Sequence, residues 1–94
     1  MITNIEIRKS VLVMGALKSK LRSEMISFIK SGIEVHLIDI EIKFNISRFK
    51  ALKNLAILKR AELILEDKYS SPFEYRINPD KVENLEKAIS LIVD

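Results

Sequence analysis

Basic side chains gather in one short segment of this sequence. Positions 43–60 hold six lysines and arginines and no acidic residue. The six are Lys43, Arg48, Lys50, Lys53, Lys59 and Arg60. Lysine and arginine bind phosphate, and arginine also donates paired hydrogen bonds to base edges. The segment therefore indicates an anionic partner, and the alternative is a surface helix whose basic face is merely solvated.

The same segment has the pattern of an amphipathic helix over Ser47–Ala61. Ser47 is a favourable N-cap, and no glycine, proline or acidic residue interrupts the stretch. Its apolar residues recur at three- and four-residue steps and share one face, namely Ala51, Leu55, Leu58 and Ala61. The polar residues that fall mostly off this stripe are Arg48, Lys50, Lys53 and Asn54. A helix anchored on one side and cationic on the other fits the major groove of double-stranded DNA.

Length and composition set the frame for this helix. The 94 residues suit a single domain over 1–94, and 48% hydrophobic with 31% charged residues is typical of a soluble globular protein. No apolar run approaches the ~20 residues that a membrane span needs. The first residues do not resemble a secretory signal, so we expect a cytoplasmic protein without a membrane partner.

Several kinds of chemistry are disfavoured by the residues that are missing. There is no cysteine and one histidine, so thiolate metal sites and cysteine nucleophiles are excluded and a histidine metal site is not expected. With two glycines, the chain has no phosphate-cradling loop. We expect neither an enzyme nor a cofactor or metal, and we expect His36 to be packed or hydrogen-bonded.

Two helices are predicted before the basic segment. Thr3 and Glu6 have capping-box spacing, so a first helix should start there and end at Gly15. Its apolar residues either join the core or form a dimer seam. A second helix should span 16–31. Lys20 and Arg22 at its start either meet phosphate or are solvated.

The stretch 33–44 is ambiguous, because its residues fit both a strand and a helix with a wide apolar face. We assign 33–36 to a short strand or extended link and 37–44 to a short helix. Asn45 tolerates the left-handed conformation that a tight turn needs, and Ile46 should plug this turn from inside.

A hairpin and a last helix should follow the basic helix. Segments 63–67 and 73–77 flank a turn, and Phe73, Tyr75 and Ile77 share one buried side. Asn78 and Pro79 then start a helix that reaches the C-terminus. The fold class is therefore mostly α with a small β-hairpin, arranged as a winged helix-turn-helix in the order helix, helix, short strand, helix, helix, hairpin, helix.

Two stretches resemble the ArsR-type transcriptional repressors, and related MarR-type and archaeal groups share part of the pattern. ALKSKLRSEMISFIKSG over 16–32 is similar to the family's "AL-x-S-x-x-R" start of its second helix. IDIEIKFNISRFKALKNLAILKRAELI over 38–64 is similar to "E-L-A-x-x-L-G-L-S-x-x-x-V-S-x-H-L-x-x-L-x-x-A-G-L-V". In this alignment Asn54-Leu55 stands for His-Leu, and Ala61-Glu62-Leu63-Ile64 for Ala-Gly-Leu-Val. The resemblance spans about 16–77.

The resemblance implies a homodimeric regulator of double-stranded DNA, expected to act as a repressor, that pairs through its N- and C-terminal helices, 1–14 and 79–94. The 47–61 helix would lie in the major groove. The expected DNA-binding residues are Ser47, Arg48, Phe49, Lys50, Lys53, Asn54, Lys20, Arg22, Lys68, Tyr69 and Arg76. Arg48, Lys50 and Asn54 would face bases, while Lys53, Lys20 and Arg22 would face phosphates.

Three departures from the family pattern limit what is carried over. The cysteine pair and the histidine ligands of its metal sensors are missing, so metal sensing is not expected. Phe49 and Leu52 replace groove-facing polar residues, although they could touch a thymine methyl group. The hairpin is acidic, so its DNA contact would rest on Lys68, Tyr69, Ser70 and Arg76. The alternative function is a protein-interaction module with Phe49 and Leu52 as apolar anchors.

Overall fold

A computed structural model describes residues 4–70 and 73–81, with side chains from residue 11 onward. The elements follow in the order α1 (Asn4–Leu17), α2 (Lys20–Ser31), β1 (Val35–His36), α3 (Leu37–Phe44), α4 (Arg48–Arg60), β2 (Ile64–Asp67) and β3 (Glu74–Ile77). This order confirms the predicted arrangement of helices, short strand and hairpin. Residues 79–81 begin a helical turn, and the rest of the predicted last helix lies outside the described residues.

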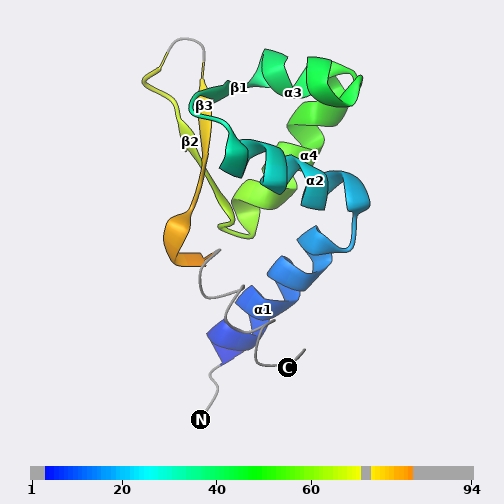
Figure 1. The fold of residues 1–94 in the computed structure, drawn as a ribbon. Coiled ribbons are helices and arrows are strands. Elements are labelled where there is room, and N and C mark those ends of the chain that lie inside the picture. The colour runs from blue at the N-terminus through cyan, green and yellow to red at the C-terminus, as the bar shows by residue number, and fades with distance from the viewer. Residues whose placement is uncertain (1–3, 71–72, 82–94) are drawn as a thin grey trace.

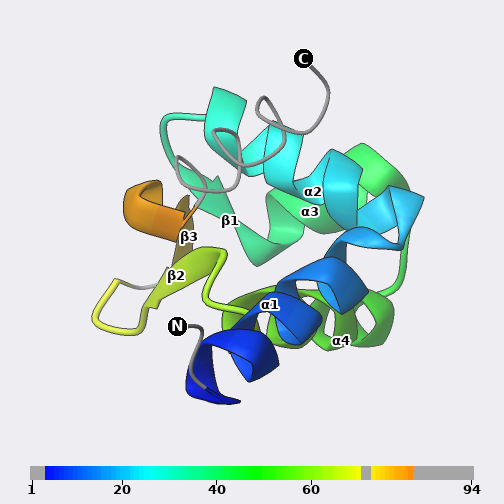
Figure 2. The same ribbon diagram turned by 90° about the horizontal axis from the view of Figure 1, so that it is seen from below.

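Helices α2, α3 and α4 pack together, the sheet lies along one side of them, and α1 extends away from this body (Figure 1). Seen from below, α1 lies beside α4 (Figure 2). The strands are antiparallel in the order β1-β3-β2. Tyr75 of the central strand is opposite Val35 on one side and Glu66 on the other. Strand β1 therefore joins the hairpin to the start of α3.

The predicted boundary between the first two helices is wrong. Helix α1 continues through Gly15 to Leu17, and α2 begins at Lys20 with Ser19 as its N-cap, whose hydroxyl accepts a hydrogen bond from the backbone N–H of Arg22 at 3.3 Å. A glycine inside a helix costs only ~1 kcal/mol, which tertiary contacts offset. The compensating contact comes from Arg22, which donates to the carbonyls of Gly15 and Ala16.

The turn between α3 and α4 forms as the sequence predicts. Asn45 has φ 51° and ψ 51°, the left-handed conformation that an asparagine tolerates. The next backbone N–H, of Ile46, donates to the carbonyl of Glu41 at 3.2 Å, which satisfies an end of α3. The Ile46 side chain packs against the core. The turn thereby fixes where α4 starts.

The predicted apolar stripe of α4 is confirmed as core. Ala51, Leu55, Leu58 and Ala61 are each at most 4% exposed. They lie among buried residues from the other elements: Met25, Ile29, Val35, Ile40, Leu63, Ile64 and Tyr75. Each fully buried large apolar side chain contributes about 1.5–3 kcal/mol, so this seam holds α4 in place. Among the described residues, no helix is long and apolar enough to cross a membrane.

Candidate nucleic-acid interface

The outward side of α4 carries a mixture of cations and apolar residues at its N-terminal half. Ser47 caps the helix by accepting the backbone N–H of Lys50 at 3.1 Å. Arg48, Lys50 and Lys53 are all exposed, as the pattern predicts. Phe49 is 78% and Leu52 44% exposed. The first turns of α4 therefore present side chains to solvent on a helix whose other face is buried.

Three of the six basic residues in the segment remain available at this end of α4. Lys43 stands over the ring of Phe28, 5.9 Å from its centroid, and Lys59 pairs with Glu66 at 3.1 Å. Over residues 4–70 and 73–81, Arg48, Lys50 and Lys53 form no ion pair. The cationic character of the interface thus rests on these three residues, with Arg60 at the far end of the helix.

Asn54 does not lie where the sequence predicts. It is 7% exposed and turned inward, although the spacing places it off the apolar stripe. Its amide nitrogen donates to the carbonyl of Lys50 at 2.8 Å, and its carbonyl oxygen accepts from Arg22 at 3.0 Å. The reason is that a buried polar group is stable when its hydrogen bonds are made, and Arg22 supplies the missing donor.

Arg22 is likewise engaged inside the protein. Its guanidinium donates to Ala16 O at 2.8 Å and to Gly15 O at 3.3 Å, as well as to Asn54. A rigid planar fork with five donors can serve three acceptors in different directions at once, whereas the three donors of a lysine lie on a single nitrogen. We name this set the Arg22 clamp: Arg22, Asn54, Gly15 and Ala16. Lys20, two residues earlier, is exposed.

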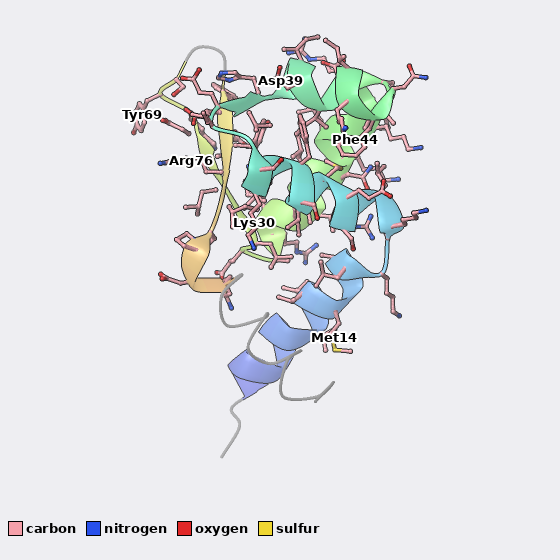
Figure 3. The ribbon with its side chains drawn as sticks, in the orientation of Figure 1. Met14, Lys30, Asp39, Phe44, Tyr69 and Arg76 are labelled. Carbon is pink, nitrogen blue, oxygen red and sulfur yellow. The ribbon has the colours of Figure 1, made fainter. Side chains whose placement is uncertain are left out.

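The tip of the hairpin is organised by Asp67. The carboxylate accepts the Ser70 hydroxyl at 2.9 Å and the backbone N–H of Tyr69 at 3.0 Å. These hydrogen bonds lower the pKa of Asp67, so the carboxylate stays ionised. The predicted contact residues Lys68, Tyr69 and Arg76 are exposed, and Figure 3 shows Tyr69 and Arg76 pointing away from the helices.

The hairpin is also tied to the helix-turn-helix. His36 Nδ1 lies 2.9 Å from the carbonyl oxygen of Phe73, which agrees with the prediction of a hydrogen-bonded histidine. The backbone N–H of His36 donates to Asp39 at 2.9 Å, at the start of α3. A hollow of about 380 Å³ lies where these elements meet, and it is lined by Leu37, Arg48, Leu52, Phe73 and Tyr75. The start of α4 and the hairpin therefore form one continuous surface.

Sequence reasoning missed one backbone feature. Glu62, just after α4, has φ 62°, a conformation that favours glycine. The available signal was the alignment of Glu62 with the glycine of the family pattern. The left-handed residue turns the chain from α4 into β2, where the backbone N–H of Leu63 donates to Leu58 O at 3.1 Å.

The fold and this surface define a winged helix-turn-helix protein, with α3 and α4 as the helix-turn-helix and β2–β3 as the wing. No protein-family model matches the chain, and no curated protein matches it. The solved structures that are similar to this chain include the following two. An ArsR-like transcriptional regulator from Rhodococcus sp. RHA1 has a TM-score of 0.79 and 18% identity over 97% of this chain and 83% of its own. HlyU from Vibrio cholerae N16961 has a TM-score of 0.75 and 16% identity over 96% and 97%. The likeness shows the fold of ArsR-type winged-helix proteins.

Proposed function

We propose that this protein is a transcriptional regulator that binds double-stranded DNA in a sequence-specific manner and acts as a homodimer. The observation that carries the proposal is the first half of α4, where three exposed cations, Arg48, Lys50 and Lys53, lie on a helix whose inner face is buried. The similar ArsR-like protein from Rhodococcus sp. RHA1 supports it, because that protein is a transcriptional regulator. The protein is expected to act in the cytoplasm and to repress by occupying its site.

In the proposed complex, the N-terminal half of α4 enters the major groove. Arg48 and Lys50 face base edges, and Lys53 and Lys20 face phosphates. Ser47 and Phe49 contact the groove at the start of the helix. Lys68, Tyr69 and Arg76 of the wing approach the flanking backbone. The sequence assigns Arg22 and Asn54 to DNA contact. In the proposed complex they instead position α4 relative to α1 and α2 through their hydrogen bonds.

Pairing of two copies is proposed to use the N-terminal helix together with residues 79–94. On α1, Val11 is 63% and Met14 67% exposed, and Figure 3 shows Met14 pointing away from the body. Exposed apolar side chains on a projecting helix are suited to a symmetric contact. A dimer would present two α4 helices about one turn of DNA apart, roughly 34 Å, to a pseudo-palindromic site.

The test is a titration of DNA binding against salt. Selection from a random duplex pool supplies the best site, and fluorescence anisotropy then measures its affinity. Each phosphate contact should contribute about −0.9 to the slope of log affinity against log salt. The double variant Arg48→Ala, Lys50→Ala should lose most of the binding.

The matched control is Lys59→Ala, Arg60→Ala, which removes the same charge from the opposite end of the same helix. The two ends are about 18 Å apart at 1.5 Å per residue, so this control should bind nearly as well as the unaltered protein. Binding that does not depend on salt, or equal losses in the two double variants, would contradict the proposal.

A second candidate function is a protein-interaction module. The observation that favours it is the exposure of Phe49 at 78% and Leu52 at 44%, because neighbouring exposed apolar side chains can mark a protein interaction site. Absence of DNA binding in the salt titration would favour this function.

A further inference from the structure

We propose that α4 recognises thymine through its 5-methyl group, with Phe49 and Leu52 as the residues that contact it. This inference rests on the proposed DNA-binding function and specifies which base that function selects. The thymine methyl group is the most prominent apolar feature that a base pair presents in the major groove, and apolar side chains contact it. An apolar side chain on a groove-facing helix therefore has this methyl group as its main base-specific partner.

Phe49 and Leu52 are placed to act together. They lie three residues apart, so they are neighbours on the surface of the helix. Neither side chain is needed to fill the core, because Phe49 is 78% and Leu52 44% exposed. Leu52 also lines the hollow with Leu37 and Phe73, so the apolar surface continues from α4 towards the wing. A methyl group above α4 would meet apolar atoms over several residues.

Helix α4 has no exposed amide side chain with which to read the adenine of an A·T pair. Adenine is recognised in the major groove by the paired hydrogen bonds of an asparagine or glutamine amide. The chain has no glutamine, and the asparagine of α4, Asn54, is buried with its amide engaged by Lys50 O and Arg22. Discrimination of A·T pairs by α4 therefore depends on the thymine side of the pair.

Charge complementarity selects DNA as the occupant of this apolar surface. Arg48, Lys50 and Lys53 flank Phe49 and Leu52 and, within the part of the chain that the structure describes, form no ion pair. The major groove has the matching arrangement, with phosphates along its walls and methyl groups on its floor. The cations would bind the walls while the apolar pair meets the floor.

The experiment replaces thymine by uracil in the selected duplex, one position at a time. This change removes the methyl group and keeps every base-pair hydrogen bond. Because only the DNA is altered, the folding of the protein is not affected. Burial of one methyl group corresponds to a change of about fourfold in affinity. We expect a loss of about this size at one or two thymines in each half-site, with an unchanged salt slope.

The protein variants identify the contacting side chains. Each variant, Phe49→Ala or Leu52→Ala, should lose the difference in affinity between the thymine and uracil duplexes when the substituted thymine is the one that the missing side chain contacts. The matched control is Ile33→Ala, which removes a 99% exposed apolar side chain outside the hollow and should keep full sensitivity to uracil.

The outcomes separate the two proposals. Salt-dependent binding that is equal for thymine and uracil duplexes would overturn thymine recognition and leave DNA binding intact. A uracil effect that survives in both alanine variants would also overturn it, because other residues would then contact the methyl group. Absence of any salt-dependent binding would overturn the proposed function and this inference together.

Discussion

At the scale of single residues, the most consequential side chain is Arg22. Its guanidinium joins three elements, because it donates to the end of α1 and to Asn54 of α4 while it belongs to α2. The sequence predicts a surface cation at this position, either facing a phosphate or solvated. The physical difference is Asn54, whose buried oxygen needs a donor and whose partner could not be identified from spacing alone.

We predict that Arg22→Ala lowers the free energy of unfolding by about 1–3 kcal/mol, because it leaves the buried Asn54 oxygen without a partner. Urea denaturation measures this. Lys20→Ala, an exposed lysine on the same helix, should change stability by less than about 0.5 kcal/mol. The double variant Arg22→Ala, Asn54→Ala should be less destabilised than the sum of the single changes. Additive losses would contradict the clamp.

Glu62 gives a prediction of opposite sign. A non-glycine residue in the left-handed conformation is strained by about 1–2 kcal/mol, and a glycine relieves this strain. Glycine also loses about 0.5–1 kcal/mol more conformational entropy on folding, which offsets part of the relief. Glu62→Gly should therefore stabilise the protein by roughly 0.5–1 kcal/mol, seen as a higher melting temperature. Glu62→Gln, which keeps the backbone strain, should not. A lower melting temperature for Glu62→Gly would show that the Glu62–Lys81 ion pair at 3.7 Å outweighs the strain.

At the scale of elements, local sequence signals are sufficient to predict the bounds of a helix where they agree with each other. The turn and the start of α4 are predicted nearly residue by residue, because Asn45 tolerates the left-handed conformation and Ser47 is a favourable N-cap, whereas α3 lies in a stretch that is ambiguous from the sequence. The boundary of α1 and α2 could not be found in this way. It depends on the contact of Arg22 with the carbonyls of Gly15 and Ala16, and this contact is made across a turn.

For the candidate site, the sequence predicted which side chains of α4 would be exposed, apart from Asn54. It did not predict that Lys43 and Lys59 would be engaged elsewhere, because Phe28 and Glu66 come near them only in the folded chain. The DNA contacts themselves stay predictions.

The sheet provides a test with pH. Burial raises the pKa of Tyr75 above its ordinary 10.0, and the facing Glu66 raises it further while Arg48 lowers it. The folded protein therefore holds this proton more tightly than the unfolded chain. The contribution of Tyr75 to stability is complete below about pH 10, the pKa in the unfolded chain, and is lost as pH rises through the folded pKa.

We expect the urea midpoint to fall as the pH rises above about 10, the unperturbed pKa of tyrosine, and to fall less steeply in Tyr75→Phe. Tyr69→Phe is the control, because Tyr69 is fully exposed at the tip of the hairpin. Equal slopes for the two variants would show that Tyr75 does not titrate differently in the folded state.

At the scale of the whole molecule, α1 is the helix to which we assign the proposed contact with a second copy. It extends from the body and contacts α2 and α4 through only part of its surface (Figures 1 and 2). Ala16 is buried, whereas Val11 and Met14 lie mostly in solvent. The buried end anchors the helix, and the exposed side is the one that a partner copy would cover.

We predict that Val11→Glu combined with Met14→Glu prevents dimer formation, because each copy would place two charges in an apolar contact. Sedimentation equilibrium should give a monomer mass for this variant and a dimer mass for the unaltered protein. Circular dichroism checks that the fold persists. Ile33→Glu, on the loop after α2, should remain dimeric. A monomer mass for the unaltered protein would contradict the proposed dimer.

The inward stripe of α4 has a consequence for how such a protein can change over time. Ala51, Leu55 and Leu58 hold α4 in the core, whereas positions 49, 50 and 53 contribute little to folding because they lie mostly in solvent. These outer positions can be randomised together in a library without loss of the scaffold. Target preference is therefore free to drift, or to be reprogrammed, while the architecture stays as it is.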